Sequence, residues 1–312
     1  MDEQKLYLQG IRAVLFDFDG TLVDSVADIA TAVNAALQHF DLPPVDMSKI
    51  RTFVGDGSKA LIQRAALFSS HSLGMGIEIP IGIIDAIHAW YLQYYNQHPL
   101  VQTQLYPNIT QLLMQLEKHG IYMGIVTSKP GTICHKILHH FAIEHFFSVV
   151  VAQEHVNNLK PHPEGIQKAV RAISAKIAHV EDPNGLPIVQ DEETSLRKAI
   201  AFVAADEYSE YEEEFEDEAE QLFVPAPLTQ KDIVAFAHTL DVDDFDTNAP
   251  TFPLLAPEQV LMVGDSAGDI HAGVAFGCHT AAVTGGFGNA VKLMEAPAEI
   301  VVHYASDLLL NA

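Results

Sequence analysis

The sequence predicts an α/β fold with a Rossmann-like parallel sheet as its core. Short, almost continuously apolar runs, such as RAVLFDF, alternate with segments of helical periodicity. Such runs are typical of strands buried on both faces, and their alternation with helices implies parallel strands joined by right-handed crossovers. The alternation is interrupted at residues 25–100 and again at residues 179–255. The predicted core therefore carries two insertions.

The elements of the core follow one another along the chain. Strands are expected in the runs RAVLFDF, IYMGIVT, FSVVVA, QVLMVGD and HTAAV. Helices are expected between them, over residues 107–119, 131–141, 163–178 and 267–276. The core domain is predicted to consist of residues 1–24, 101–178 and 256–312.

The first interruption, residues 25–100, has no convincing strand but several helical patterns. They include SVADIATAVNAALQHF, GSKALIQRAALF and IGIIDAIHAWYLQYYNQH. The aromatic residues of the last segment could form a ligand-stacking face, although packing in a small core is favoured. We expect an α-helical cap domain here, hinged next to the first strand.

The second interruption, residues 179–255, is strongly acidic. It contains 20 acidic and 3 basic residues, a net charge of −17 out of a total of −24, so the rest of the chain carries only −7. SLRKAIAFVAA and KDIVAFAHTL have helical periodicity, which indicates a partly folded segment. DVDDFDTNAP resembles a Ca²⁺ loop but lacks the glycine and closing glutamate of an EF-hand, so a charged surface is expected. A connection from helix to strand places this insertion at the amino ends of the strands.

Composition excludes several classes of partner. A net charge of −24 argues against nucleic acid or an anionic membrane. No apolar run reaches the roughly 18 residues of a membrane span, and the start MDEQKLYLQG lacks the features of a signal peptide. The two cysteines, Cys134 and Cys278, indicate a reducing compartment rather than a disulfide framework. We expect a soluble cytoplasmic protein.

Polar residues follow four of the predicted strands. Ligands of open parallel sheets bind at the carboxyl ends of the strands, so these residues should meet at one edge. Two aspartates spaced two residues apart leave a strand on the same face. The residues are Asp17 and Asp19 with Gly20 after the first strand, Thr127 and Ser128 after the second, Lys160 after the third and Asp265 after the fourth.

Each of these residue types suits phosphoryl transfer. Clustered carboxylates need a compensating cation, and Mg²⁺ prefers oxygen ligands. One carboxylate can attack phosphorus, and a second can protonate the leaving group and later activate water. Lysine and hydroxyl groups can hold the phosphoryl oxygens. Each residue alone has an ordinary explanation, since Asp265 or Ser266 could simply cap the next helix, but the ordered set favours a phosphoryl-transfer site.

The segments DFDGTLVDS, VTSKP, LKPHPEG and VGDSAGDI resemble the four motifs of the haloacid dehalogenase-like hydrolase superfamily. The resemblance covers about residues 10–178 and 256–312. Within the superfamily the chain is most similar to the phosphoglycolate phosphatase family, because FVGDGSKALIQRA resembles its cap loop and YPNITQLLMQLEKHG its returning helix. This resemblance implies a Mg²⁺-dependent phosphatase with a helical cap inserted after the first motif.

The resemblance also implies roles for individual residues. Asp17 would be the nucleophile and a metal ligand, Asp19 the acid/base and a ligand through its backbone carbonyl, and Asp265 the third ligand. The residues that bind the phosphoryl group would be Gly20, Thr127, Ser128 and Lys160, with Asp269 and Ser266 as supporting residues. Asp19 excludes the dehalogenases, whose pattern lacks this carboxylate. Ala267 and Gly268 depart from the family, since many relatives carry Arg and Asn there.

The cap offers candidates for substrate recognition. Gly55, Asp56 and Gly57 form a turn that could approach the substrate closely or could simply begin the next helix. Arg51 and Arg64 could pair with a substrate carboxylate.

The predicted function is therefore hydrolysis of a small phosphorylated metabolite, foremost 2-phosphoglycolate, through an aspartyl phosphate. Two alternatives stay open. One is a phosphatase for a sugar phosphate, a nucleotide or pyrophosphate, and the other is a non-catalytic regulatory relative that acts through the acidic insertion. Self-association or a protein partner would also involve residues 179–255.

Overall fold

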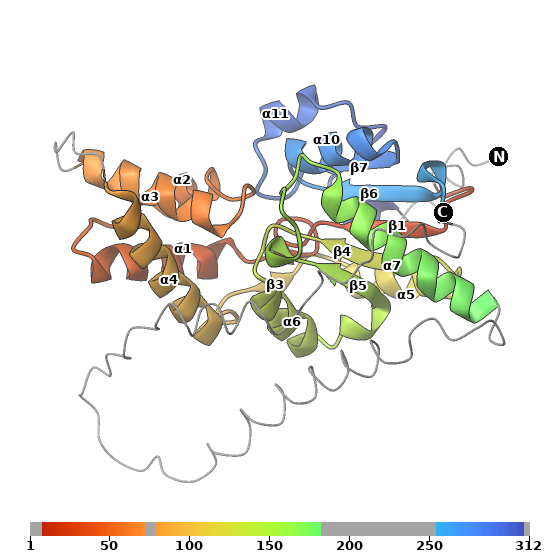
Figure 1. Cartoon of the computed structure of the whole chain (residues 1–312), viewed down its shortest axis with the longest axis horizontal. Helices are drawn as coiled ribbons and strands as arrows, with labels where there is room; N and C mark the ends of the chain where they lie inside the picture. The colour runs from red at the N-terminus through yellow and green to blue at the C-terminus, as the bar shows by residue number, and fades with distance from the viewer. Residues whose placement is uncertain (1–7, 73–78, 182–253, 309–312) are drawn as a thin grey trace, which may run out of the picture. The chain divides into compact units, whose positions relative to one another are not determined.

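The structure, a computed structural model, describes residues 8–72, 79–181 and 254–308. Contacts divide the chain into one unit of residues 1–176 and 250–312 and another of residues 177–249. The first unit contains both the sheet and the helical cap (Figure 1). The expectations for the acidic insertion, including its helices, its Ca²⁺-like segment and its place in the fold, lie outside the described residues. The predicted domain boundaries stay a prediction.

Six parallel strands form the main sheet of the described chain, in the order β5-β4-β1-β6-β7-β8. The α/β prediction is confirmed, and the first five strands in sequence match the predicted runs, whereas β8 was not predicted. β1 is central and pairs with β4 on one side and β6 on the other. The bounds are β1 Ala13–Phe16, β4 Tyr122–Val126, β5 Phe147–Val151, β6 Val260–Gly264, β7 His279–Val283 and β8 Ile300–Val302.

Helices flank this sheet, and β1 and β6 are completely buried beneath them. Four of the helices lie where periodicity predicted them, and α11 was not predicted. They are α5 Ile109–Lys118, α6 Gly131–His140, α7 Glu164–Glu181, α10 Ala267–Phe276 and α11 Ala290–Glu295. Short 3₁₀ turns occupy Glu144–Phe146, Gln153–His155, Pro257–Gln259 and Ala305–Leu308.

The described part of the cap contains four helices, which lie between the first and second strands of the main sheet in sequence. α1 packs against α4, and α3 also contacts α4. Tyr91 and Tyr95 on α4 are buried in the same apolar cluster as Val33 and Leu37 on α1, so the aromatic residues of α4 contribute to packing. The bounds are α1 Val26–His39, α2 Met47–Arg51, α3 Ser58–Ser72 and α4 Ile81–Gln97.

The chain leaves and re-enters the core side by side. β2 (Val23–Asp24) pairs antiparallel with β3 (Gln104–Leu105). The buried carboxylate of Asp28, in the first turn of α1, accepts hydrogen bonds of 2.7–3.0 Å from the backbone of Gln102 and from the backbone and hydroxyl of Thr103. The two linkers are therefore bound to each other at the base of the cap.

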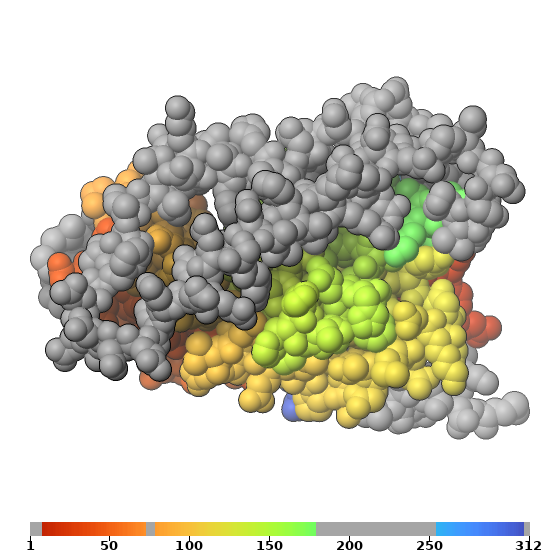
Figure 2. Space-filling model, turned by 90° about the horizontal axis from the view of Figure 1, so that it is seen from below, coloured from red at the N-terminus to blue at the C-terminus, as the bar shows by residue number. Residues whose placement is uncertain are grey.

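The cap also contacts the core beyond its linkers. α4 touches α6, and the orange residues of α4 and the yellow-green residues of α6 form a continuous surface (Figure 2). Lys136 of α6 donates a hydrogen bond of 3.2 Å to the carbonyl of Asn96 in α4. No helix in residues 8–72, 79–181 and 254–308 is long and apolar enough to cross a membrane. Both cysteines are free and buried.

Candidate active site

Three carboxylates meet at the carboxyl ends of the central strands. Asp17 follows β1 and Asp265 follows β6, and these strands are neighbours because Phe16 pairs with Val263. Asp269 lies in the first turn of α10. One oxygen from each carboxylate lies within 4.8 Å of the others, and all three residues are buried. Strand pairing thus brings together residues that are far apart in the sequence.

Lys160 is the cation of this cluster. Its Nζ lies 2.8 Å from Oδ1 of Asp17 and 2.6 Å from Oδ1 of Asp269, and it donates to the carbonyl of Val126 at 2.9 Å. Burial lowers the pKa of Lys160, but the charges of Asp17 and Asp269 outweigh that effect and raise this pKa above its usual value. The side chain is therefore a permanent ammonium group between two carboxylates.

With all three carboxylates ionised, the cluster would carry more negative charge than Lys160 compensates. Burial, followed by the charge of Asp269, raises the pKa of Asp17 to about 7, although Lys160 acts in the opposite sense. Burial also raises the pKa of Asp265 well above its usual value, with Asp17 and Asp269 adding to the effect. Three ionised carboxylates and one ammonium would leave two uncompensated negative charges in a buried place. A divalent cation with oxygen ligands, such as Mg²⁺, fits this donor set and charge.

Asp265 is enclosed by glycine-containing backbone. Its Oδ2 accepts hydrogen bonds from the backbone N–H groups of Phe287, at 2.6 Å, and Gly288, at 2.9 Å. Gly20 has a φ of +86°, and a Cβ at this position would lie 2.1 Å from the same oxygen. Only glycine allows this approach. The loop after β7 was not foreseen as part of the site, because no motif marks it.

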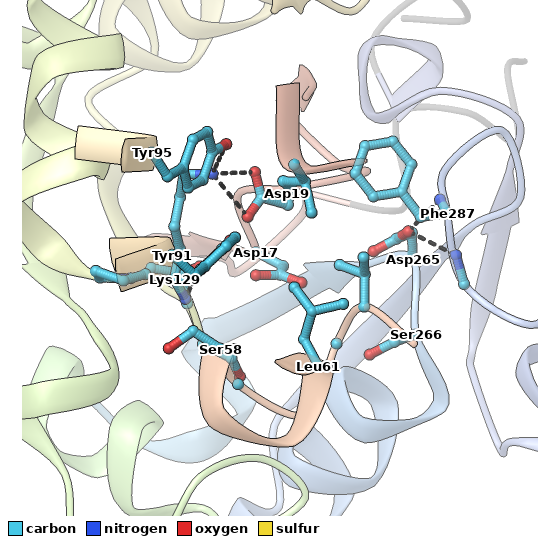
Figure 3. Close-up of a pocket in the computed structure, with 18 residues that line it drawn as sticks. Asp17, Asp19, Ser58, Leu61, Tyr91, Tyr95, Lys129, Asp265, Ser266 and Phe287 are labelled. Carbon is cyan, nitrogen blue, oxygen red and sulfur yellow. Dashed lines mark hydrogen bonds and ion pairs between the residues drawn. The ribbon is translucent and has the colours of Figure 1, made fainter. Parts of the chain in front are cut away.

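Asp19 forms a second pair with a lysine. Nζ of Lys129 lies 2.9 Å from Oδ1 and 3.1 Å from Oδ2 of Asp19, and it donates to the hydroxyl of Tyr95 at 2.7 Å (Figure 3). The hydroxyl of Ser25 also donates to Asp19. Lys129 is buried, and it links the core to cap helix α4. Sequence reasoning missed it, since it stands in the motif VTSKP without any feature that separates it from a surface lysine.

The two hydroxyls after β4 face the same pocket. Oγ1 of Thr127 accepts a hydrogen bond of 3.1 Å from the backbone N–H of Lys129. Oγ of Ser128 is buried and has no hydrogen-bond partner in the described structure. A buried hydroxyl without a partner is costly, so Ser128 suits a ligand that brings an acceptor oxygen.

A pocket lies between these residues and the cap, with a cavity volume of about 50 Å³. A water molecule needs roughly 10–15 Å³ on this measure, so the cavity suits a ligand of a few heavy atoms. Figure 3 shows Asp17, Asp19 and Asp265 on the core side and Ser58, Leu61 and Tyr91 from the cap. The lining residues are Asp17, Asp19, Ile29, Val54, Gly55, Gly57, Ser58, Leu61, Tyr91, Tyr95, Thr127, Ser128, Lys129, Pro130, Asp265, Ser266, Phe287 and Gly288.

The cap loop touches the core beside the pocket. Gly57 has a φ of +90°, and a Cβ there would lie 2.8 Å from Cδ1 of Leu159. Ser58 donates to Oε1 of Gln153 from its N–H at 3.3 Å and from its hydroxyl at 3.0 Å. The same hydroxyl lies 2.8 Å from Nε2 of His88, whose pKa burial lowers to about 4. The ring is therefore uncharged at neutral pH, and the cap is closed on the core.

The other predicted cap residues are not among those that line the pocket. Arg64 is exposed and pairs with Asp56 on the surface, and it also donates to the carbonyl of Phe53 at 3.1 Å. Arg51 donates to the carbonyl of Gly286, and its guanidinium group lies 5.8 Å from the ring centre of Phe287. The structure thus brings Gly55 and Gly57 to the pocket but not Asp56, Arg51 or Arg64, whose charged groups have partners of their own.

Ser266 caps the amino end of helix α10, which was one of its two predicted roles. Its hydroxyl accepts from the backbone N–H of Asp269 at the start of α10 and donates to Oδ2 of the same residue at 2.6 Å. It thereby also fixes the carboxylate that Lys160 contacts. Gly268 leaves room beside Lys160, since a Cβ there would lie 3.8 Å from the backbone carbon of that residue.

Comparison with known proteins identifies the family. A family model described as haloacid dehalogenase-like hydrolase matches residues 14–182, which is more than half of the chain. The chain belongs to the haloacid dehalogenase-like hydrolases. A second model, described as HAD-hydrolase-like, matches residues 231–308.

Curated relatives and solved structures agree with this assignment. The chain is 33% identical to the phosphoglycolate phosphatase of Vibrio cholerae over 156 residues, which cover 50% of this chain and 68% of the relative. It is 34% identical to that of Salmonella typhi over 168 residues, or 50% and 67% of the two chains. A crystal structure of a predicted phosphoglycolate phosphatase from Haemophilus somnus superimposes with a TM-score of 0.66 at 22% identity, covering 96% of this chain and 97% of that one. The predicted family, fold class and class of enzyme, a phosphoric monoester hydrolase, are confirmed.

Proposed function

We propose that this phosphatase hydrolyses a small phosphomonoester, foremost 2-phosphoglycolate, through an aspartyl phosphate on Asp17. The observation that carries the proposal is the pocket in which Asp17, held by Lys160 at 2.8 Å, and Asp19 face the same cavity. A nucleophile and an acid/base side by side, with cations for the phosphoryl oxygens, are what this reaction needs.

In the first step a carboxylate oxygen of Asp17 attacks phosphorus, and the bond from phosphorus to the ester oxygen breaks. Asp19 gives its proton to that leaving oxygen. In the second step Asp19 takes a proton from water, and the water oxygen attacks the aspartyl phosphate, which releases phosphate and restores Asp17. Lys160, Thr127 and Ser128 hold the phosphoryl oxygens through both steps, where stabilisation of charge contributes most.

Mg²⁺ is part of the proposal. Asp17, Asp265 and the backbone carbonyl of Asp19 would hold it, while Asp269 positions Lys160. Bound there, the ion would offset the negative charge of the carboxylates and of the phosphoryl group. The two negative charges that Lys160 would leave uncompensated with all three carboxylates ionised support a divalent ion.

The substrate is inferred from the relatives and from the pocket. Several relatives are named phosphoglycolate phosphatases, and a cavity of about 50 Å³ favours a small ester over a nucleotide. The buried charged cluster argues for an enzyme rather than a non-catalytic regulatory relative, since buried ion pairs are costly to keep without a use. A small phosphorylated metabolite as partner and a cytoplasmic location belong to the same proposal.

Hydrolysis assays test this function. We expect Mg²⁺-dependent release of p-nitrophenol from p-nitrophenyl phosphate. In a panel of 2-phosphoglycolate, glucose 6-phosphate, AMP and pyrophosphate, we expect kcat/KM to be highest for 2-phosphoglycolate by roughly tenfold or more, which is about 1.4 kcal/mol of differential binding. Absence of hydrolysis would contradict a phosphatase, and a higher kcat/KM for another ester would overturn the substrate.

A further inference from the structure

Lys129 brings a second positive charge to the site, at Asp19 rather than at Asp17. Lys160 already contacts the nucleophile Asp17, whereas Lys129 contacts Asp19 and Tyr95. Among the described residues that line the pocket, Lys129 is the one with a cationic side chain. Its ammonium also lies 4.6 Å from the ring centre of Tyr95, so it reaches from the end of β4 to the cap.

The walls around Lys129 are mostly apolar. The cap and hinge side of the pocket is lined by Ile29, Val54, Leu61 and Tyr91, and Phe287 adds an aromatic ring from the core. The hydroxyls on this side, those of Ser58 and Tyr95, already have partners in Gln153 and Lys129. A substrate with several hydroxyls would find few partners on these walls, and unsatisfied polar groups disfavour binding. A short chain that ends in one anionic group would instead find one buried ammonium.

The donors of Lys129 are at present fully used. An ammonium group has three N–H donors, and here they serve both oxygens of Asp19 and the hydroxyl of Tyr95. In the proposed reaction Asp19 must turn one oxygen to the leaving group, so it cannot keep both oxygens on Lys129. At least one donor of Lys129 then becomes free beside the leaving group.

We propose that Lys129 is the specificity-determining residue that binds a carboxylate of the substrate next to the phosphate ester. This inference rests on the proposed phosphatase function and deepens it: the preferred substrates are short phosphomonoesters with a carboxyl group on the carbon that bears the phosphate ester. The substrate carboxylate takes the place of one Asp19 oxygen on the ammonium. Arg51 and Arg64, the earlier candidates for this task, are bound to other groups.

The test compares two esters that differ only in this acid group, 2-phosphoglycolate and 2-hydroxyethyl phosphate. In the wild type we expect a higher kcat/KM for 2-phosphoglycolate. Lys129→Met should lower kcat/KM for both esters, since Asp19 loses a partner. The decrease should be larger for 2-phosphoglycolate than for 2-hydroxyethyl phosphate by a factor of roughly ten or more. Lys129→Arg keeps the charge and should restore part of the preference.

Lys136→Met is the matched control. Lys136 also joins the core to α4, through the carbonyl of Asn96, but it does not line the pocket. This variant should leave the ratio of the two kcat/KM values unchanged. Thermal unfolding shows whether each variant is folded, and Lys129→Gln takes the place of Lys129→Met if the latter does not fold.

A second measurement separates binding from turnover. Calorimetry measures the Kd of each ester for the inactive variant Asp17→Asn and for the double variant Asp17→Asn with Lys129→Met. The second substitution should raise the Kd of 2-phosphoglycolate by a factor that is roughly ten or more times the factor for 2-hydroxyethyl phosphate. Equal losses for the two esters in both experiments would overturn the inference and leave Lys129 as a positioning residue for Asp19. Failure of the wild type to hydrolyse any ester would contradict the proposed function instead.

Discussion

The core side and the cap side of the pocket are held in place by different interactions. On the core side, Asp17, Asp269 and Lys160 form buried ion pairs of 2.6–2.8 Å at the ends of neighbouring strands. On the cap side, Ser58 reaches the core through hydrogen bonds of 3.0 and 3.3 Å to Gln153, and Gly57 packs against Leu159. The first set is charged and enclosed, and the second is mostly neutral.

The charged core side thus suits catalysis, and the mostly neutral cap side suits recognition of the substrate. A hydrogen bond between neutral groups contributes about 0.5–1.5 kcal/mol, so the contacts of the cap loop can be broken at modest cost. Charged groups in a buried site are far more costly to separate. We therefore expect the catalytic cluster to keep its geometry in any opening of the cap, and closure to add exclusion of water and contacts with the substrate.

The largest loss of activity is expected from removal of the nucleophile on the core side. Asp17→Asn replaces a carboxylate by an amide, a poor nucleophile, and we expect kcat to fall by roughly 10³-fold or more. Hydrolysis of p-nitrophenyl phosphate measures the loss, and circular dichroism checks the fold. Asp85→Asn is the control, because Asp85 is exposed on the cap and pairs only with Lys59 among the bonds of the described chain. More than a few per cent of wild-type activity in Asp17→Asn, with deamidation excluded, would refute the assignment.

Removal of the metal ion should cause the second largest loss of activity. EDTA should lower activity by roughly 100-fold or more, and Mg²⁺ should restore it, because Asp17, Asp265 and Asp269 would carry two more negative charges than Lys160 offsets when all three are ionised. Ca²⁺ should not restore activity, since it accepts more ligands in a looser geometry. Phosphate release with each ion at matched concentration measures this. Full activity in Ca²⁺ alone would contradict the proposed site.

The cap side should respond in a graded way. Gly57→Ala places a methyl group 2.8 Å from Leu159 at a φ of +90°, and this should hinder closure. We expect kcat/KM to fall about tenfold, a cost of about 1.4 kcal/mol, with an unchanged dependence on Mg²⁺. Gly82→Ala is the control, since nothing lies within 4 Å of a Cβ there. An unchanged kcat/KM in Gly57→Ala would show that this contact is not needed for turnover.

The smallest effect is expected from the cap hydrogen bonds. Ser58→Ala removes the hydroxyl that bonds Gln153 and His88 but keeps the backbone N–H bond. KM should rise about threefold, since the two hydrogen bonds that are lost join neutral groups and each contributes little. Steady-state kinetics measure it beside Ser72→Ala, whose hydroxyl bonds only its own helix in the described structure. A loss of a hundredfold would place Ser58 among the catalytic groups and remove the distinction between the two sides.

The core side was largely predictable from the sequence, because its signals are local. An apolar strand that breaks at a polar residue marks a strand end, and the ends of parallel strands share an edge. Asp17, Thr127, Ser128 and Asp265 could be placed at the pocket by this rule. Their individual roles remain predictions that the variants above test.

The rest depends on contacts between distant residues. Lys129 meets Asp19 only because β4 pairs with β1, and a lone lysine after a strand gives no sign of its partner. β8 was missed because it has three residues and is only partly buried. The arginines of the cap were favoured for their charge, but sequence does not reveal the direction of a side chain on a helix surface.

The two linkers between core and cap, β2 and β3, are paired with each other, so the attachment of the cap does not depend on the cap's own structure. Val23 pairs with Leu105 and Asp24 with Gln104, so the chain returns to the core next to the place where it left. The distance that an inserted segment must span is therefore fixed by these two residue pairs, whatever the segment's length. A cap of another size or sequence could therefore join the core at the same two linkers and leave Asp17 and Lys160 where they are, so that recognition of the substrate could change without a change in the catalytic groups.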